Sequence, residues 1–490
     1  MLIEILKPAV LVPWLLGMVF GVFVGATPGL TATMAVALIV PISFYLEPNA
    51  GLALIIGVSF TAIFAGDIPA TYLRIPGTPA SAAATLDGNE LAKRGQGSLA
   101  LVIDLICSCL GGMIGVGVLM LIARPLARFA LHFSDFEYFW LGILGLSLSA
   151  LVSRGSTLLG LIAAALGILI STVGMDVVSG VPRYSFGNVE LLEGLNFIPV
   201  MIGLFGFAEV LRNVTAAQQM AAPTIRAQET GTAKASIQEV WNHKWLVLRS
   251  ALLGTGIGAL PGAGADIAAW GAYGLAKVTS RESEQFGTGA VEGVIAPTSA
   301  NNAAVAGAWI PALVFGIPGD AVTAIVLGAM MMYNITPGPQ LFESGTQVQA
   351  IFLIALVTQL LLLPAGLLGI KAFDWILRLP RRLVLTAVMV FSVVGSFAIR
   401  NSLFDVYVMF AFGLIGFFLE AKKVPLAPVI LGLILGDLIE KKLRAGLISS
   451  SGDVTPMFTR PICVALVALL VTALVVVPAT RWARSRLLAS

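Results

Sequence analysis

The sequence predicts an all-α integral membrane protein with about 10–12 transmembrane helices, supplemented by half-helices or re-entrant hairpins. Two observations carry this prediction. The chain of 490 residues is 58% hydrophobic and only 11% charged, with a mean hydropathy of +0.95, and long apolar runs follow one another along it. Ordinary soluble domains are about 25% charged. The composition therefore excludes a soluble enzyme or a disordered scaffold, and a net charge of +3 gives no reason to expect a nucleic-acid partner.

Glycine and proline indicate that some of these helices are broken. The chain holds 52 Gly and 25 Pro but few polar linkers, so most of them lie in or beside apolar segments. Several apolar runs, 301–316 among them, are too short to cross a bilayer alone and end near Pro-Gly pairs. Broken helices are tolerated at membrane depth only where protein or a water-filled cavity covers the freed backbone groups. We therefore expect half-helices around a polar site.

The chain divides into two membrane parts. Residues 1–25 are apolar without a strongly basic flank or a small-residue cleavage site, which predicts a retained first helix rather than a signal peptide. The polar stretch 213–244 is interpreted as a linker between an N-terminal membrane repeat, 1–212, and a C-terminal repeat with additional helices, 245–490. The distribution of Lys and Arg among the last loops predicts a cytoplasmic C-terminus.

Cysteine and histidine give no catalytic or metal signature. Cys107, Cys109 and Cys463 lie in apolar runs, where a small packing residue is expected. Only two histidines, His132 and His243, are present, and they stand at segment edges without an obvious catalytic partner. No GxSxG motif occurs. We expect a protein that is not an enzyme and that has no cofactor.

Two sequence blocks recur in the two parts. GVFVGATPG (21–29) matches GTGIGALPG (254–262) at an offset of 233 residues. GDIPATYLRIPGTPAS (66–81) matches AWIPALVFGIPGDAVT (308–323) at an offset of 242. The blocks keep their order, which predicts two internal repeats. We expect the repeats to be inverted in the membrane.

The repeated unit has a physical meaning. Gly17, Gly21, Gly25 and Gly29 recur at every fourth residue, which places one glycine stripe on a helix face where another backbone can approach. The Pro-Gly pair that follows breaks the helix. The next helix must begin with unpaired N–H groups and the positive end of its dipole, which attract anions. Two such ends predict an anion site between the repeats.

The substrate-site candidates are residues of these breaks. They are Pro28, Gly29, Thr31, Thr33, Gly77, Thr78, Pro261, Gly262, Gly264, Gly319 and Arg74. Arg74 is the only basic residue inside a repeated motif, so it could bind a substrate carboxylate through its fork of N–H donors. The alternative is an interfacial arginine whose head reaches water.

Four polar residues of the second part are candidates for the ion site. Asp320 directly follows Pro318-Gly319, so helix capping is an alternative role for it. Asp266 stands where Thr33 stands in the first repeat, and an acidic residue there indicates a cation or proton partner. Asn301 and Asn302 could supply carbonyl oxygens to sodium, while a simple N-cap is the alternative for one of them. Asp104 is expected to pair with a basic residue of another helix.

The motifs taken together resemble the large membrane subunit of tripartite tricarboxylate transporters, the TctA family. The matching stretches are GVFVGATPGLTATMAVALIVP (21–41), RIPGTPASAAATLDGNELAKRGQ (74–96), GALPGAGADIAAWGAYGLAK (258–277), FGTGAVEGVIAPTSANNAAVAGAWIPALVFGIPGDAVTAIVLGAM (286–330) and ITPGPQLF (335–342). Two departures stand out. The family's acidic residue before ANNA is replaced by Thr298-Ser299, and the first-half segment before IPG carries Asp67 where the family is rich in Gly and Ser.

The resemblance implies secondary active uptake, by symport, of a di- or tricarboxylate anion across the bacterial inner membrane by a multi-pass subunit. It implies Na+ as the typical coupling ion, with the proton as the alternative. It also implies two partners besides the lipid bilayer: a small TctB-type membrane subunit and a periplasmic TctC-type solute-binding protein. The alternatives are a passive anion channel and a membrane-embedded enzyme.

Overall fold

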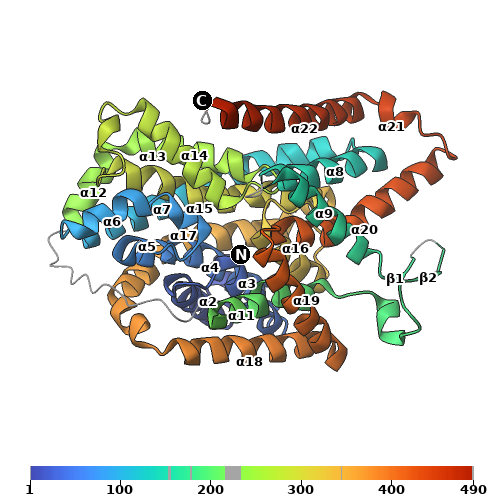
Figure 1. The fold of residues 1–490 in the computed structure, drawn as a ribbon, viewed down its shortest axis with the longest axis horizontal. Helices are drawn as coiled ribbons and strands as arrows, with labels where there is room; N and C mark the ends of the chain where they lie inside the picture. Colours follow the sequence, from blue (N-terminus) through green and yellow to red (C-terminus); the bar gives the residue numbers. More distant parts are fainter. Residues whose placement is uncertain (1, 153–155, 177–178, 216–232, 344, 488–490) are drawn as a thin grey trace.

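The computed structural model describes residues 2–152, 156–176, 179–215, 233–343 and 345–487, and this part of the chain is almost entirely helical (Figure 1). The expectation of an all-α membrane protein is confirmed. Seven helices among the described residues are long and apolar enough to cross a membrane, and shorter apolar helices accompany them. The seven segments are Pro8–Ala26, Pro48–Leu73, Gly97–Ala130, Phe197–Thr215, Gly345–Phe373, Arg382–Arg400 and Leu403–Ala421.

The elements follow in this order. The first part holds α1 (Leu2–Ile5), α2 (Pro8–Ala26), α3 (Ala32–Ser43), α4 (Pro48–Ala65), α5 (Asp67–Leu73), η1 (Pro79–Ala82), α6 (Thr85–Lys93), α7 (Gly97–Ala130), α8 (Asp135–Val152), α9 (Thr157–Ser171), the two-stranded hairpin β1 (Gly174–Met175) and β2 (Pro182–Arg183), η2 (Val189–Glu193), α10 (Phe197–Met201), η3 (Ile202–Phe207) and α11 (Ala208–Thr215). The second part holds α12 (Ala233–Asn242), α13 (Lys244–Gly258), α14 (Gly264–Thr279), η4 (Ser283–Gln285), α15 (Glu292–Phe315), α16 (Ala321–Met332), η5 (Pro339–Phe342), α17 (Gly345–Arg378), α18 (Arg381–Arg400), α19 (Leu403–Ala421), α20 (Leu426–Ser449), α21 (Pro456–Thr459) and α22 (Pro461–Leu487).

The expected helix breaks are present. α3 and α16 each have 12 residues. At 1.5 Å per residue such a helix is about 18 Å long, well short of a hydrocarbon core of about 30 Å. Each follows a turn that contains one of the repeated Pro-Gly pairs. Of the expected linker 213–244, residues 216–232 lie outside the described residues, and its end forms α12 and the start of α13.

Glycine allows the long helices to pack backbone against backbone. A Cβ atom on Gly25 of α2 would lie 2.4 Å from the Ala62 carbonyl of α4, and one on Gly258 of α13 would lie 2.1 Å from the Ala304 carbonyl of α15. One turn earlier, Gly21 faces Val58 in the same way as Gly254 faces Ala300. The partner residues on α4 and α15 differ by 242 residues, the offset of the second repeated block. The two-repeat organisation and its inversion stay predictions.

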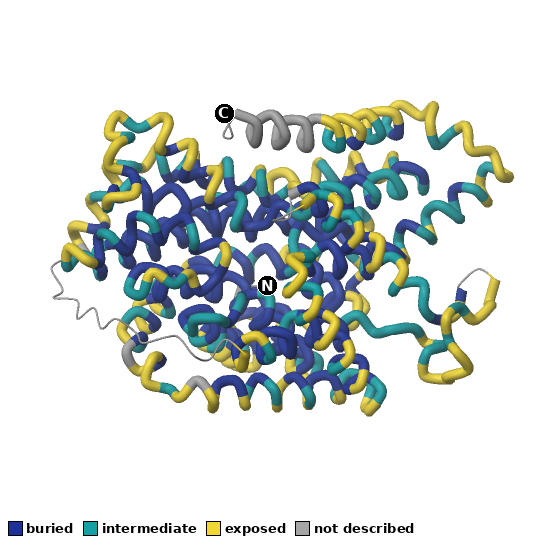
Figure 2. The backbone as a smooth tube through the Cα atoms, viewed as in Figure 1, coloured by how far each residue is buried: buried dark blue, intermediate teal, exposed yellow. Residues whose placement is uncertain are grey.

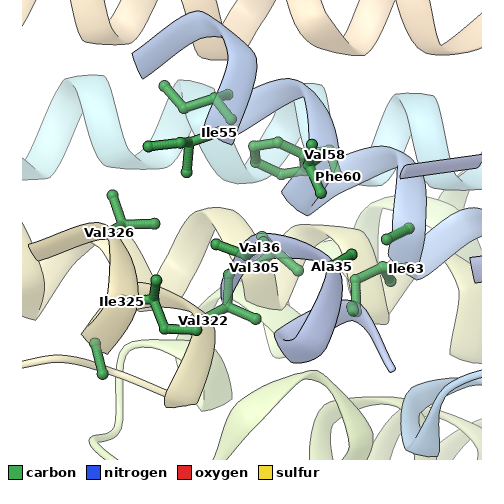
Figure 3. Close-up of a cluster of buried hydrophobic side chains, with 14 of the residues drawn as sticks. Ala35, Val36, Ile55, Val58, Phe60, Ile63, Val305, Val322, Ile325 and Val326 are labelled. Atoms are coloured by element: carbon green, nitrogen blue, oxygen red, sulfur yellow. The ribbon is translucent and has the colours of Figure 1, made fainter. Parts of the chain in front are cut away.

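The core joins the two parts of the chain. Figure 3 shows apolar side chains of α3, α4, α15 and α16 in one cluster, among them Val36, Val58, Val305 and Val322. Burial is concentrated in the central helices, whereas α18, α22 and the β1–β2 hairpin lie at the edges of the molecule (Figure 2). Many large apolar side chains on outer helices are exposed, for example Leu121 of α7 at 76%. An outer surface of this kind is suited to lipid.

The glycine packing gives a stability prediction. We expect Gly258→Ala to lower the free energy of unfolding by about 1–3 kcal/mol, because the new methyl group would force α13 away from the α15 backbone. Gly256→Ala is the matched control, since a Cβ there meets no atom within 4 Å. The control should be neutral or up to about 1 kcal/mol more stable, because alanine favours the helix. Thermal unfolding of the purified protein measures both, and equal effects would contradict the close-packing account.

Candidate functional site

A cavity of about 390 Å³ lies where the broken segments meet. The first part of the chain contributes Thr31 and Thr33 at the start of α3 and Thr78 before η1. The second part contributes residues 262–267 at the start of α14 and 320–322 at the start of α16. The cavity thus brings together seven of the residues singled out from the sequence: Thr31, Thr33, Thr78, Gly262, Gly264, Asp266 and Asp320.

Four helices begin at this cavity. The first residues of α3, α14, α16 and α20 all line it. Each helix start presents backbone N–H groups and the positive end of a helix dipole. Thr31 caps α3 by accepting a hydrogen bond from the Met34 N–H at 3.2 Å. The convergence of several such ends makes the cavity wall favourable for an anion.

The glycines of the motifs build the turns, and two of them, Gly262 and Gly264, also line the cavity. Gly262 and Gly264 have φ angles of 82° and 66°, a left-handed conformation that glycine adopts without strain. The Gly262 N–H donates to the Gly319 carbonyl at 2.6 Å, which ties the two breaks of the second part together. Gly77 holds the corresponding place in the first part, where its N–H donates to the Gly66 carbonyl at 3.0 Å. Pro28, Gly29, Gly77, Pro261 and Gly319 are not among the residues that line this cavity.

Arg74 does not line this cavity either. It is the left-handed residue that ends α5, with a φ angle of 58°, and its side chain is exposed. Its charge acts on Glu90 of α6 instead. The basic residue that lines the cavity is Arg212 of α11.

Arg212 belongs to an ionic network that the sequence analysis missed. It pairs with Glu209 of its own helix and, at 2.9 Å, with Glu420 at the end of α19. Asn213 donates to the Glu209 carboxylate at 2.6 Å and to the Gly29 carbonyl at 3.2 Å. The network therefore ties α11 and α19 to the first Pro-Gly turn. One feature of the sequence could have predicted part of this network: Glu209 and Arg212 are three residues apart at the end of an apolar run.

Asp320 caps a helix. Its carboxylate accepts hydrogen bonds from the Thr323 N–H and the Thr323 hydroxyl, both at 2.7 Å, and the Thr323 hydroxyl in turn accepts from the Asp320 N–H. This capping box starts α16. Asp266 lies in the first turn of α14, lines the same cavity and interacts electrostatically with Asp320. Two carboxylates therefore share the cavity wall with the helix starts.

Asn301 and Asn302 occupy a second, deeper site. Both are fully buried in the middle of α15, so the N-cap alternative for one of them is wrong. The helix begins nine residues before Asn301, at Glu292, because the preceding segment is also apolar. The Asn301 side-chain amide donates to the Asp67 carboxylate of α5 at 3.3 Å. Asp67 thus lies against the ANNA segment (300–303). The acidic residue that the resemblance leads one to expect before this segment is replaced by Thr298-Ser299.

Asp104 lies in the same region. Its carboxylate accepts a hydrogen bond from the Ser108 hydroxyl at 3.1 Å and interacts electrostatically with Asp67. The expected basic partner is not found, since no ion pair of Asp104 occurs among the described residues. The two histidines lie elsewhere: His132 contacts backbone carbonyls of α7, and His243 lies near Glu239 and Glu292.

Comparisons with known proteins point to one family. The model described as the "Tripartite tricarboxylate transporter TctA family" matches residues 11–431. The chain is 35% identical over 464 residues to an uncharacterized 52.8 kDa protein in the TAR-I ttuC' 3' region of Agrobacterium vitis, covering 94% of this chain and 92% of the relative. It is 37% identical over 217 residues to an uncharacterized protein in the TAR-II ttuC' 3' region of the same organism, covering 44% and 90%. No solved structure matches.

The capping role of Asp320 can be separated from a role of its charge. We expect Asp320→Ala to lower the free energy of unfolding by about 0.5–2 kcal/mol, because the first turn of α16 loses its cap. Asp320→Asn should be close to wild type, since asparagine caps helices as well as aspartate does. Thermal unfolding compares the two variants. An Asn variant as unstable as the Ala variant would show that the charge, not the cap, matters.

Proposed function

Since the chain belongs to the tripartite tricarboxylate transporter TctA family, we propose that it carries a di- or tricarboxylate anion through the cavity between its broken helices. The chain is the large membrane subunit of such a transporter, and its family is one of transport proteins rather than enzymes. The substrate, the coupling ion and the partners belong to the proposal.

One observation carries the anion-site proposal: the starts of α3, α14, α16 and α20 line the same cavity. Backbone N–H groups at these ends can bind carboxylate oxygens without any positively charged side chain. Thr33 and Thr78 are among the polar residues that line the wall. A volume of about 390 Å³ falls in the usual range for small-molecule sites.

The charges of the cavity favour coupling to a cation. Asp266 and Asp320 line the wall beside the helix starts, and Arg212 is already paired with two glutamates. A multiply charged anion would be repelled by these carboxylates unless positive charge entered with it. We propose symport with Na+, with the proton as the alternative, and Asp266, Asp320, Asn301 and Asn302 as ion-side residues.

The proposal includes two related repeats. The equivalent glycine contacts of α2 with α4 and of α13 with α15 support it, because the same pairs of positions meet in both halves. Substrate sites between repeats, formed by discontinuous helices, are a recurrent design of secondary transporters. We propose that the repeats are inverted.

The proposal also includes the setting of the subunit. It works in the bacterial inner membrane with its C-terminus in the cytoplasm. A small TctB-type membrane subunit accompanies it, and a periplasmic TctC-type binding protein delivers the carboxylate. The alternative of a passive anion channel differs in one respect: flux through a channel would not depend on an ion gradient.

The uptake prediction rests on Thr33. Thr33→Val keeps the shape of the side chain and removes its hydroxyl from the cavity wall. A hydrogen bond to a charged group is worth about 1.5–3 kcal/mol. We therefore expect the half-saturating carboxylate concentration to rise by roughly 10- to 100-fold. The measurement is uptake of labelled di- and tricarboxylates by vesicles that contain the three subunits, with and without a sodium gradient.

Thr386→Val is the matched control, because Thr386 is exposed on α18 and bonds only the Arg382 carbonyl in its own helix. The control should leave uptake unchanged. An unchanged half-saturating concentration in the Thr33→Val variant would contradict the assigned site. Uptake that proceeds equally without any gradient would favour the channel.

A further inference from the structure

Two buried carboxylates lie in the interior, next to the cavity but apart from its wall. Asp67 begins α5 and Asp104 lies in α7, each about 1% exposed or less. They interact electrostatically with each other. Asn301 and Asn302 of α15 contact the same region and are fully buried. Two like charges in such a place are costly unless something compensates them.

The surrounding protein offers no positive charge. No Lys or Arg of the described residues lies within 4.0 Å of either carboxylate. The neighbouring α2, α4 and η1 contain no ionisable side chain, and α15 contains none after Glu292. On α7 the nearest titratable group is the Cys107 thiol, which interacts electrostatically with Asp104. No ion pair of the described residues therefore compensates either carboxylate, which favours a cation bound between them.

Three oxygen atoms at this place have no partner. Each carboxylate uses one oxygen for a neutral donor: Asp67 accepts from Asn301 at 3.3 Å, and Asp104 accepts from Ser108 at 3.1 Å. The second oxygens, Asp67 Oδ1 and Asp104 Oδ2, accept no hydrogen bond from the described residues. The side-chain oxygen of Asn302 is also unpartnered, although its amide nitrogen donates to the Ser108 carbonyl at 3.4 Å.

A further unpartnered group lies beside Gly112, two turns along α7 from Asp104. Asp104, Ser108 and Gly112 follow one another at every fourth residue and so share one helix face. A Cβ on Gly112 would meet the Gln359 side-chain oxygen at 2.1 Å, which places this amide on the same face. Gln359 is fully buried, and neither side-chain atom has a hydrogen-bond partner among the described residues. Unsatisfied buried polar groups are rare in proteins, so the unpartnered oxygens of Asp67, Asp104 and Asn302 favour a bound cation.

Hydrogen bonds connect this cluster to the cavity. The Thr78 hydroxyl, which lines the cavity, lies 2.8 Å from the Ser81 hydroxyl. Ser81 in turn lies close to the Asp67 carboxylate, which accepts from Asn301. Occupation of the cluster can therefore alter the geometry of Thr78 in the cavity wall. That connection is what coupling of an ion to a substrate requires.

We propose that Asp67, Asp104 and Asn302 bind one sodium ion, and that this is a coupling site of the transporter, separate from the carboxylates of the cavity wall. The coupling role rests on the function proposed above, whereas the binding itself does not. A hard cation with oxygen ligands fits the three unpartnered oxygens. The remaining negative charge is offset by the donors Asn301, Ser81 and Ser108 and by the N-terminal turn of α5.

Direct binding tests the site without any substrate. Purified protein in detergent should bind ²²Na+ saturably, at about one ion per chain. Asp104→Asn and Asp67→Asn should each weaken this binding at least tenfold. Asp437→Asn is the control: Asp437 is exposed on α20 and pairs with Lys441. It should bind sodium as the wild type does.

Thermal stability tests the site in a second way, because the substitution is expected to raise the Tm in the absence of sodium. In sodium-free buffer Asp104→Asn should have a higher Tm than the wild type, because an amide replaces an uncompensated buried charge. Added NaCl should raise the wild-type Tm by on the order of a few degrees and leave that of the variant unchanged. A variant that unfolds at lower temperature than wild type in sodium-free buffer would contradict the proposal.

Other outcomes would overturn the site. Equal stabilisation by NaCl, KCl and choline chloride would show that no sodium site exists. A wild-type Tm that responds to pH but not to sodium would mean that the carboxylates are compensated by protons. Sodium binding that depends on Asp104, in a protein that transports no carboxylate, would support the site and contradict the proposed function instead.

Discussion

The structure depends on one constraint: a helix that starts inside an apolar interior leaves its first N–H groups without partners. The chain meets this constraint at the starts of α3, α14, α16 and α20 by placing them around one cavity. Threonine and aspartate caps satisfy some of the donors, as Thr31 and Asp320 do, and the remainder face the cavity. The close glycine contacts of α2 with α4 and of α13 with α15 help to position the breaks, because they let the long helices pack backbone against backbone.

Much of this could be predicted from sequence because the determinants are local. The Pro-Gly pairs end one helix and start the next through backbone chemistry alone, so the breaks at Gly29 and Gly262 were predictable. Small polar residues beside a break then line the space that it opens, as Thr33 and Asp266 do. The glycine stripe likewise needs only helical periodicity. The pairing of Gly21 with Val58 and of Gly254 with Ala300 was not predicted, but it follows the same offsets as the repeated blocks.

The rest could not be predicted, because it depends on contacts between distant segments. Arg212 and Glu420 are separated by 208 residues and meet at the cavity. Arg212 and Glu420 each lie at a helix end, where the sequence alone indicates an ordinary interfacial charge. Asp67 and Asn301 are 234 residues apart, and nothing local indicates that they touch. Arg74 shows the converse: its place inside a motif was visible in the sequence, but its exposed position in a left-handed turn outside the cavity lining was not.

The central claim is that a carboxylate binds among the converging helix starts. A structure of the protein determined by electron microscopy with a di- or tricarboxylate present tests this claim most directly. The account predicts ligand density in the cavity of about 390 Å³, in contact with Thr33 and with the backbone at the start of α14. Density at Arg74, or an empty cavity at a ligand concentration that saturates uptake, would contradict it.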